Sequence, residues 1–145
     1  MKYMLLVYLE EGALSETERE HCYVESAQLA RDLSTSGKYI ASGPLHPVAT
    51  ATSVRVRNGK RLVTDGPFAE TRELIAGYWI WKVKSIDEAV EWARRIPFDD
   101  ESAKSDAEVD LRPIFEVEDF GPELTPELKK LEDRLRTKAA KLKEN

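Results

Sequence analysis

Short runs of apolar residues along the chain predict four strands of a buried sheet. The first run covers residues 2–9 and the second covers 38–45, and both are bounded by polar or turn-forming residues. The run over 75–85 has bulky side chains at both odd and even positions, which indicates a central strand covered on both faces. The last run spans 107–117, where Pro113 favours an edge position or a bulge.

Three other segments repeat apolar residues every three to four positions and predict helices. The first lies within residues 14–37, where Ser15 and Glu18 form a capping-box pattern. The second lies within 85–97 and the third within 125–142. The third helix carries a leucine stripe that needs a partner surface: Leu124, Leu128, Leu131, Leu135 and Leu142.

Residues 51–66 carry the clearest hairpin signal in the chain. Asn58-Gly59 suits a two-residue turn in which both residues have positive φ. The pairing that follows from this turn separates a valine face from a basic face: Val54, Val56 and Val63 against Arg55, Arg57 and Lys60. The same alternation places Asp65 on the valine side, at the end of its strand and opposite Thr52. The basic face is most simply solvated.

The order of the predicted elements is β-α-β-β-β-α-β-α, and removing the hairpin leaves β-α-β-β-α-β, the ferredoxin-like arrangement. We therefore predict an α+β fold, with a ferredoxin-like domain over residues 1–117 and an inserted hairpin. A helical extension over 118–145 is expected to pack on the domain or on a dimer partner. Helices cover one sheet face, a pocket lies between sheet and helices, and the open face favours a homodimer.

Composition narrows the class of protein. The 145 residues suit one domain, and a net charge of −5 argues against a general nucleic-acid surface. Residues 125–145 carry a net charge of +3, which is more typical of a helix packed on its own dimer partner than of one bound to DNA. Cys22 is the single cysteine, so no intrachain disulfide forms and a cytoplasmic location is expected. No stretch is apolar for long enough to predict a membrane segment.

The stretch TDGPFAETRE at residues 64–73 carries the most specific signal. Its tetrapeptide Asp65-Gly66-Pro67-Phe68 resembles the signature of the DGPF subgroup of YCII-related proteins. The resemblance extends to MKYMLLVY at the start, to GYWIWKVKSIDEAVEWARRIP after the motif and to VDLRPI near the end, so it covers about residues 1–117.

The resemblance implies a dimeric α+β barrel of ferredoxin-like subunits. Related folds include enzymes similar to muconolactone isomerase and dehydrochlorinase, which act on small ring compounds. In the broader group a His on the first helix is paired with an Asp as an acid/base dyad. The corresponding region here holds Ser26 and Gln28, and His21 lies more than a turn earlier. Proteins of the DGPF subgroup also often occur with sigma factors, which implies a possible regulatory setting.

Two residues are therefore the candidates for catalysis. Asp65 is either a general base whose pKa burial would raise, or a residue that caps a turn through its own side chain. His46 is either a proton donor that approaches Asp65 from the loop before the hairpin, or an exposed loop histidine. If Asp65 and His46 lie within hydrogen-bond distance of each other in a concave, partly apolar pocket, the catalytic hypothesis is favoured over the local alternatives.

The rest of the motif supplies the candidate ligand-binding residues. Gly66 and Pro67 form a rigid extended corner, Phe68 is either a pocket wall or a core anchor, and Glu70 either contacts ligand or begins a helical turn. His21 and Glu25 are too few for a metal site, so no metal is expected.

These patterns predict a small-molecule-binding protein or a cofactor-free acid/base enzyme of isomerase or lyase type, with its pocket near the motif. The alternative is a non-catalytic module that senses a ligand or docks on a sigma factor. No phosphate-binding loop, dinucleotide fingerprint or nucleophile elbow occurs in the sequence, and no cofactor is expected.

Overall fold

The computed structural model describes residues 1–10, 12–66, 74–98 and 107–142 of the chain. In chain order the elements are β1 (Lys2–Leu9), α1 (Glu16–Thr35), β2 (Tyr39–Pro44), the short 3-10 helix η1 (Val48–Thr50), β3 (Thr52–Arg57), β4 (Lys60–Asp65), β5 (Ile75–Lys82), α2 (Ile86–Ala93), β6 (Ala107–Pro113), a second 3-10 helix η2 (Val117–Asp119) and α3 (Pro126–Leu142). Each predicted strand and helix is confirmed.

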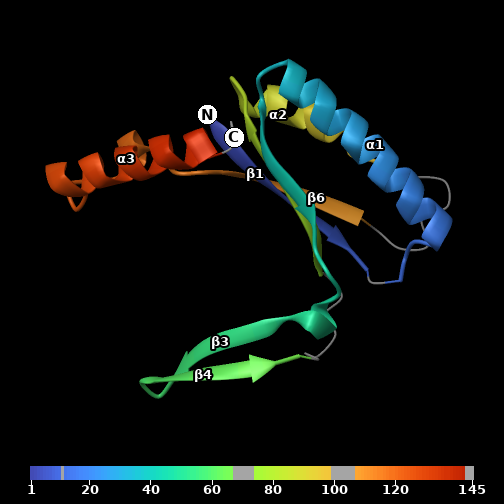
Figure 1. Ribbon diagram of the computed structural model, residues 1–145, viewed down its shortest axis with the longest axis horizontal. Helices are drawn as coiled ribbons and strands as arrows, with labels where there is room; N and C mark the ends of the chain where they lie inside the picture. The colour runs from blue at the N-terminus through green and yellow to red at the C-terminus, as the bar shows by residue number, and fades with distance from the viewer. Residues whose placement is uncertain (11, 67–73, 99–106, 143–145) are drawn as a thin grey trace.

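The main sheet has four strands in the order β2-β5-β1-β6, with every neighbouring pair antiparallel. This is the ferredoxin-like order once the hairpin β3–β4 is set aside, and it confirms the predicted fold class. The strand β5 is central as expected, and β6, which contains Pro113, lies at an edge. Figure 1 shows α1 and α2 on one side of this sheet.

The hydrophobic core lies between the sheet and these two helices. Alternate residues of β1 and β5 point toward the helices, because successive strand side chains face opposite ways. Trp81 and Leu5 are fully buried, and the Trp79 ring meets the Trp81 ring edge-on at 5.8 Å between centroids. The core residues are Tyr3, Leu5, Leu29, Leu33, Trp79, Trp81, Val83, Ala89 and Ile96.

The helix α1 begins as its sequence predicts. The Ser15 hydroxyl accepts a hydrogen bond from the backbone N–H of Glu18, and the Glu18 carboxylate accepts one from the N–H of Ser15. This capping box satisfies two N–H groups that the first turn cannot pair internally. Both buried residues of α1, Leu29 and Leu33, lie in its second half, so the first half is left for another purpose.

The hairpin β3–β4 forms a separate two-stranded sheet. Its register pairs Val54 with Val63 and Thr52 with Asp65, as predicted, and the turn residues Asn58 and Gly59 have φ of 51° and 73°. The valines are 62–70% exposed. In Figure 1 the hairpin extends from the body on the side of the main sheet away from α1 and α2.

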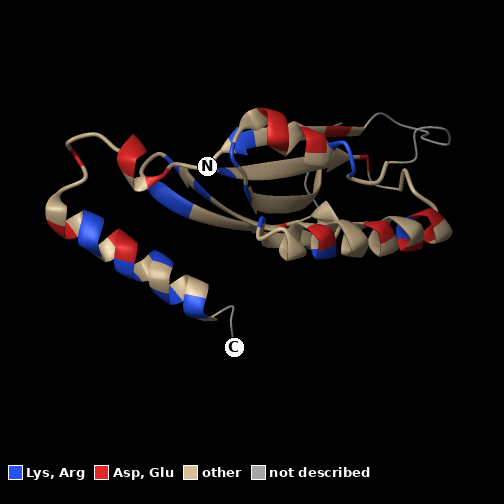
Figure 2. Cartoon of the chain, turned by 90° about the horizontal axis from the view of Figure 1, so that it is seen from above, with Lys and Arg blue, Asp and Glu red and all other residues tan. Residues whose placement is uncertain are grey.

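The helix α3 also stands apart from the main sheet (Figures 1 and 2). One residue, Arg136, ties it to the segment after β6, because its guanidinium reaches the carboxylate of Glu116 at 3.4 Å and the carbonyl of Phe115 at 3.2 Å. The predicted leucine stripe stays open, with Leu128, Leu131, Leu135 and Leu142 between 45% and 70% exposed. Among the helices of the described chain, none is apolar over a length that would cross a bilayer.

Candidate functional site

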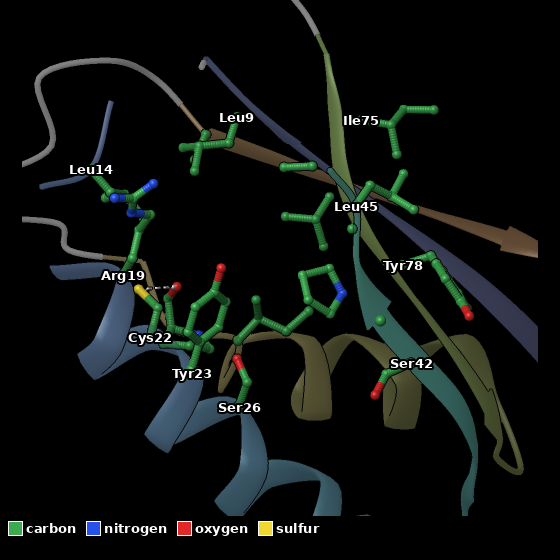
Figure 3. Close-up of a pocket in the computed structure, with 18 of the residues that line it drawn as sticks. Leu9, Leu14, Arg19, Cys22, Tyr23, Ser26, Ser42, Leu45, Ile75 and Tyr78 are labelled. Carbon is green, nitrogen blue, oxygen red and sulfur yellow. Dashed lines mark hydrogen bonds between the residues drawn. The ribbon is translucent and has the colours of Figure 1, made fainter. Parts of the chain in front are cut away.

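A cavity of about 840 Å³ opens between the first half of α1 and the main sheet. Its walls come from the end of β1, the end of β2 with the loop that follows, the start of β5 and residues 96–98. A volume of this size suits a small organic molecule. Figure 3 shows the cavity and the side chains that surround it.

One face of α1 forms the helical wall. Arg19, Cys22, Tyr23 and Ser26 all line the cavity, and their spacing of three and four residues places them on the same side of the helix. In Figure 3 Tyr23 directs its hydroxyl into the cavity. Ser26, named from the sequence only for the absence of a histidine there, is part of this wall.

The end of β2 and the loop that follows it form the opposite wall. Ser42, Leu45 and His46 lie there, and the Ser42 hydroxyl is within 2.9 Å of the Tyr39 hydroxyl, which holds its orientation. The floor of the cavity is apolar and includes Val7, Leu9, Ala30, Trp79, Ile96 and Phe98.

Several large apolar side chains on these walls are not covered by the protein itself. Tyr23 is 57% exposed, Leu45 is 50% exposed and Ile75 is 42% exposed. Scattered apolar residues are normal on a surface, but here three of them surround one concavity with an apolar floor. A ligand in the cavity would remove this apolar area from water.

Asp65 is held by a contact within the hairpin. The Thr52 hydroxyl donates a hydrogen bond of 2.7 Å to the Asp65 carboxylate, across the register pair that joins β3 to β4. Asp65 is exposed, and the described cavity walls do not include it. This contact is a cross-strand bond at the end of the hairpin away from its turn, and both roles weighed for Asp65 in the sequence stay predictions.

Of the two candidates for catalysis, His46 lies on the described cavity wall. It lies in the loop between β2 and η1 and is exposed. Within the described chain the Asp65 carboxylate accepts a hydrogen bond from Thr52, and none from His46 is found. Their joint action as an acid/base pair therefore stays a prediction.

Gly66 packs against backbone rather than against the cavity. Its N–H donates to the Ala51 carbonyl at 2.8 Å, and a Cβ at this position would lie 2.7 Å from the Ala49 carbonyl oxygen. Only a residue without a side chain fits this approach. The other three motif residues proposed for ligand binding, Pro67, Phe68 and Glu70, lie outside the described residues.

The histidine of α1 faces away from this chemistry. His21 is exposed and its Nε2 lies 3.0 Å from the carboxylate of Glu25, one turn along the helix. Nowhere in the described ranges do three or more His, Cys, Asp or Glu side chains gather closely enough to hold a metal ion. Cys22 places its sulfur 3.8 Å from the Pro97 carbonyl, at the base of the cavity.

Two carboxyl groups outside the cavity have displaced pKa values. Hydrogen bonds from Arg95, and next from Gln28, hold the pKa of Asp32 below its usual range. A hydrogen bond from the backbone N–H of Lys84, followed by the Lys38 ammonium, lowers the pKa of Glu88. The Arg95–Asp32 and Lys38–Glu88 ion pairs join separate parts of the fold, which is typical of structural ion pairs.

The fold and this cavity define an α+β protein with a ligand-sized space between its sheet and helices. Residues 1–114 match the model of the YCII-related domain, so the chain belongs to the YCII-related family. It is also 38% identical to an uncharacterised protein of Rhizobium meliloti (strain 1021) over 101 residues, which are 65% of this chain and 78% of that protein. The DGPF subgroup rests on the tetrapeptide at Asp65 and stays a prediction.

Proposed function

We propose that this protein binds a small, largely apolar molecule in the cavity between α1 and the sheet. The observation that carries the proposal is the cavity itself, which combines an apolar floor with a few polar side chains on facing walls. Tyr23, Ser26 and His46 come from two elements and surround the same space.

Acid/base chemistry on this ligand would use His46. Imidazole takes up and releases protons near neutral pH, which a cofactor-free isomerisation or elimination requires. The hydroxyls of Tyr23 and Ser26 would orient the ligand by hydrogen bonds. Asp65 remains the second candidate for the pair.

A thermal-shift screen of small ring compounds tests the binding proposal. Ala27 lines the cavity on an exposed part of α1, so Ala27→Trp would fill the entrance without disturbing the core. Val24 is 65% exposed on the same helix and is not among the described cavity residues, so Val24→Trp is the matched control. We expect compounds that stabilise the wild type and Val24→Trp but not Ala27→Trp. Hits that stabilise all three proteins equally would refute the cavity as their site.

An enzyme and a ligand sensor would use the same cavity, so binding alone does not distinguish them. Catalytic turnover of the ligand does. For any hit with an exchangeable C–H or a migrating double bond, NMR in D2O reports proton transfer directly. An enzyme acting through His46 would lose roughly 100-fold or more of this rate in His46→Gln. Asp65→Asn then measures whether Asp65 takes part. Binding with no proton transfer in the wild type would support the sensing alternative.

We also propose that the protein acts as a homodimer. The sheet face away from α1 and α2 carries apolar side chains, among them Met4, Leu6 and Ile80. The β3–β4 hairpin and α3, which carry exposed valines and leucines, extend on that same side (Figure 1). One partner in this position would cover all three surfaces, and a second copy offers the same surfaces in return. Sedimentation as a monomer at micromolar concentration would contradict this proposal.

A further inference from the structure

The charged groups of the cavity restrict the chemical class of the ligand that it can bind. Among the described residues that line it, the acidic and basic side chains are Glu10, Arg19 and His46, and all others are apolar or neutral polar groups. Glu10 follows β1 and Arg19 is the fourth residue of α1, so they reach the cavity wall from separate parts of the fold.

Arg19 forms no ion pair with any residue in the described part of the chain, Glu10 included. Two acids of the same helix have partners other than Arg19. Glu18 closes the capping box on Ser15, and Glu25 pairs with His21. The guanidinium of Arg19 therefore keeps its donors available on the cavity side of the helix.

A guanidinium beside an apolar floor is suited to one kind of ligand group. Its planar donors match a carboxylate in a two-bond arrangement, and because Arg19 is exposed, dissolved salt weakens such a charge-assisted contact. The hydroxyls of Tyr23 and Ser26 lie one and two turns further along the same face and would hold neutral polar groups of the ligand. The carboxylate of Glu10 would repel a second negative charge.

We infer that the ligand is a monoanion with an apolar body, whose single carboxylate is bound by Arg19. This inference rests on the proposed binding function and specifies the chemical class of the ligand. The apolar body would lie over the floor that contains Val7, Trp79 and Phe98.

Three probes with the same ring test this inference by calorimetric titration: naphthalene-2-carboxylate, naphthalene-2-methanol and 2-naphthylmethylamine. They differ only in carrying a negative, a neutral or a positive group. The wild type should bind the carboxylate roughly five- to tenfold more tightly than the alcohol, and added salt should reduce this preference. Arg19→Gln should bind the carboxylate and the alcohol equally.

Arg31→Gln is the matched control, because Arg31 is exposed on the same helix and is not among the described residues of the cavity. It should keep the full preference for the carboxylate. Equal binding of carboxylate and alcohol by the wild type, tighter binding of the amine, or the same loss in both arginine variants would overturn the inference.

The Ala27→Trp variant distinguishes an error in the ligand class from an error in the proposed binding site. Suppose that the wild type binds the alcohol and the carboxylate equally, and that Ala27→Trp abolishes this binding. The cavity would then still be the binding site, but Arg19 would be rejected as its anion-binding group. If no probe binds, or if Ala27→Trp leaves binding unchanged, the ligand class and the proposed cavity are both rejected.

Discussion

At the scale of single residues, Gly66 shows that a motif residue can have a purely backbone role. The chain leaves β4 at this residue and passes directly over the loop that contains η1, where the Ala49 carbonyl would be 2.7 Å from a Cβ. The hydrogen bond from the Gly66 N–H to Ala51 fixes the same approach. This contact closes the base of the hairpin and brings the segment after His46 next to the motif.

Gly66→Ala should therefore lower the free energy of unfolding by about 1–3 kcal/mol, because backbone would have to move to admit the new methyl group. Urea unfolding followed by circular dichroism measures the change. Gly121→Ala is the control, since a Cβ there meets only the mobile end of the Glu123 side chain. Equal unfolding midpoints for Gly66→Ala and the wild type would contradict this account of the motif.

A second residue contact links stability to pH. Arg95 pairs with Asp32 and also places its guanidinium 5.1 Å from the centre of the Trp92 ring, so it connects the end of α2 to α1. Because this pairing lowers the pKa of Asp32 from its ordinary value of 3.8, the folded state binds the proton more weakly than the unfolded state does. The stabilisation is complete above that value and is lost as pH falls below it.

Asp32→Asn should consequently be less stable than the wild type at neutral pH, and the difference should disappear as pH falls to about 2. Thermal unfolding across this range measures it. Glu20→Gln removes an acid from the same helix without the Arg95 contact and controls for the change in helix charge. A difference between Asp32→Asn and the wild type that stays constant down to the lowest pH would rule out the linkage.

At the scale of elements, the hairpin β3–β4 is the part of the chain that most needs an external contact. Nearly all of its residues are exposed, and it forms its own two-stranded sheet apart from the main one. A two-stranded hairpin is marginally stable in water when nothing packs on it. A surface that covers the valine face would supply the missing stabilisation.

The amides that close the β3–β4 ladder should exchange with solvent quickly when the protein is dilute and more slowly as its concentration rises. The reason is that dimer formation would bury the valine face. Hydrogen exchange read by mass spectrometry resolves this segment, and the core strands β1 and β5 provide the internal reference. Strong protection of the hairpin in a sample shown to be monomeric would remove the need for a partner.

The elements could be predicted from the sequence because each has a strong local cause. Asn58-Gly59 fixes the register of the hairpin, Ser15 and Glu18 fix the start of α1, and alternation fixes the faces of β5. The cavity could not be predicted in the same way. Its walls join α1 to a loop near residue 46, and only the packed fold brings them together.

The helical wall did leave a trace in the sequence. Arg19, Cys22, Tyr23 and Ser26 recur with helical spacing, but the face they form is mixed in polarity and does not resemble a core stripe. The sequence prediction centred on Asp65 instead, because a carboxylate at a strand end within a recognisable tetrapeptide is a strong local signal. The structure shows the division within α1, because its buried residues, Leu29 and Leu33, both lie in the second half of the helix.

For the whole molecule, a homodimer that covers the valine face of the hairpin should be sensitive to substitutions on that face and insensitive to substitutions on the other. Val54→Ser with Val63→Ser should weaken dimerisation, since both side chains lie on the valine face. Lys60→Ser with Thr64→Ser changes the opposite face of the hairpin and should leave the dimer intact. Sedimentation velocity over a range of concentrations compares the two. Equal dimer constants for both pairs would show that the valine face is not part of the interface.

A small molecule is proposed to occupy the space between α1 and the sheet. Amide NMR can show directly whether it does. Titration of the isotope-labelled protein with a ligand from the thermal-shift screen should shift the amides of residues 19–30 and 42–47, which form the facing walls. Amides of α3 should stay in place. Shifts confined to the outer sheet face or to the hairpin, with the two walls unchanged at saturation, would contradict the claim.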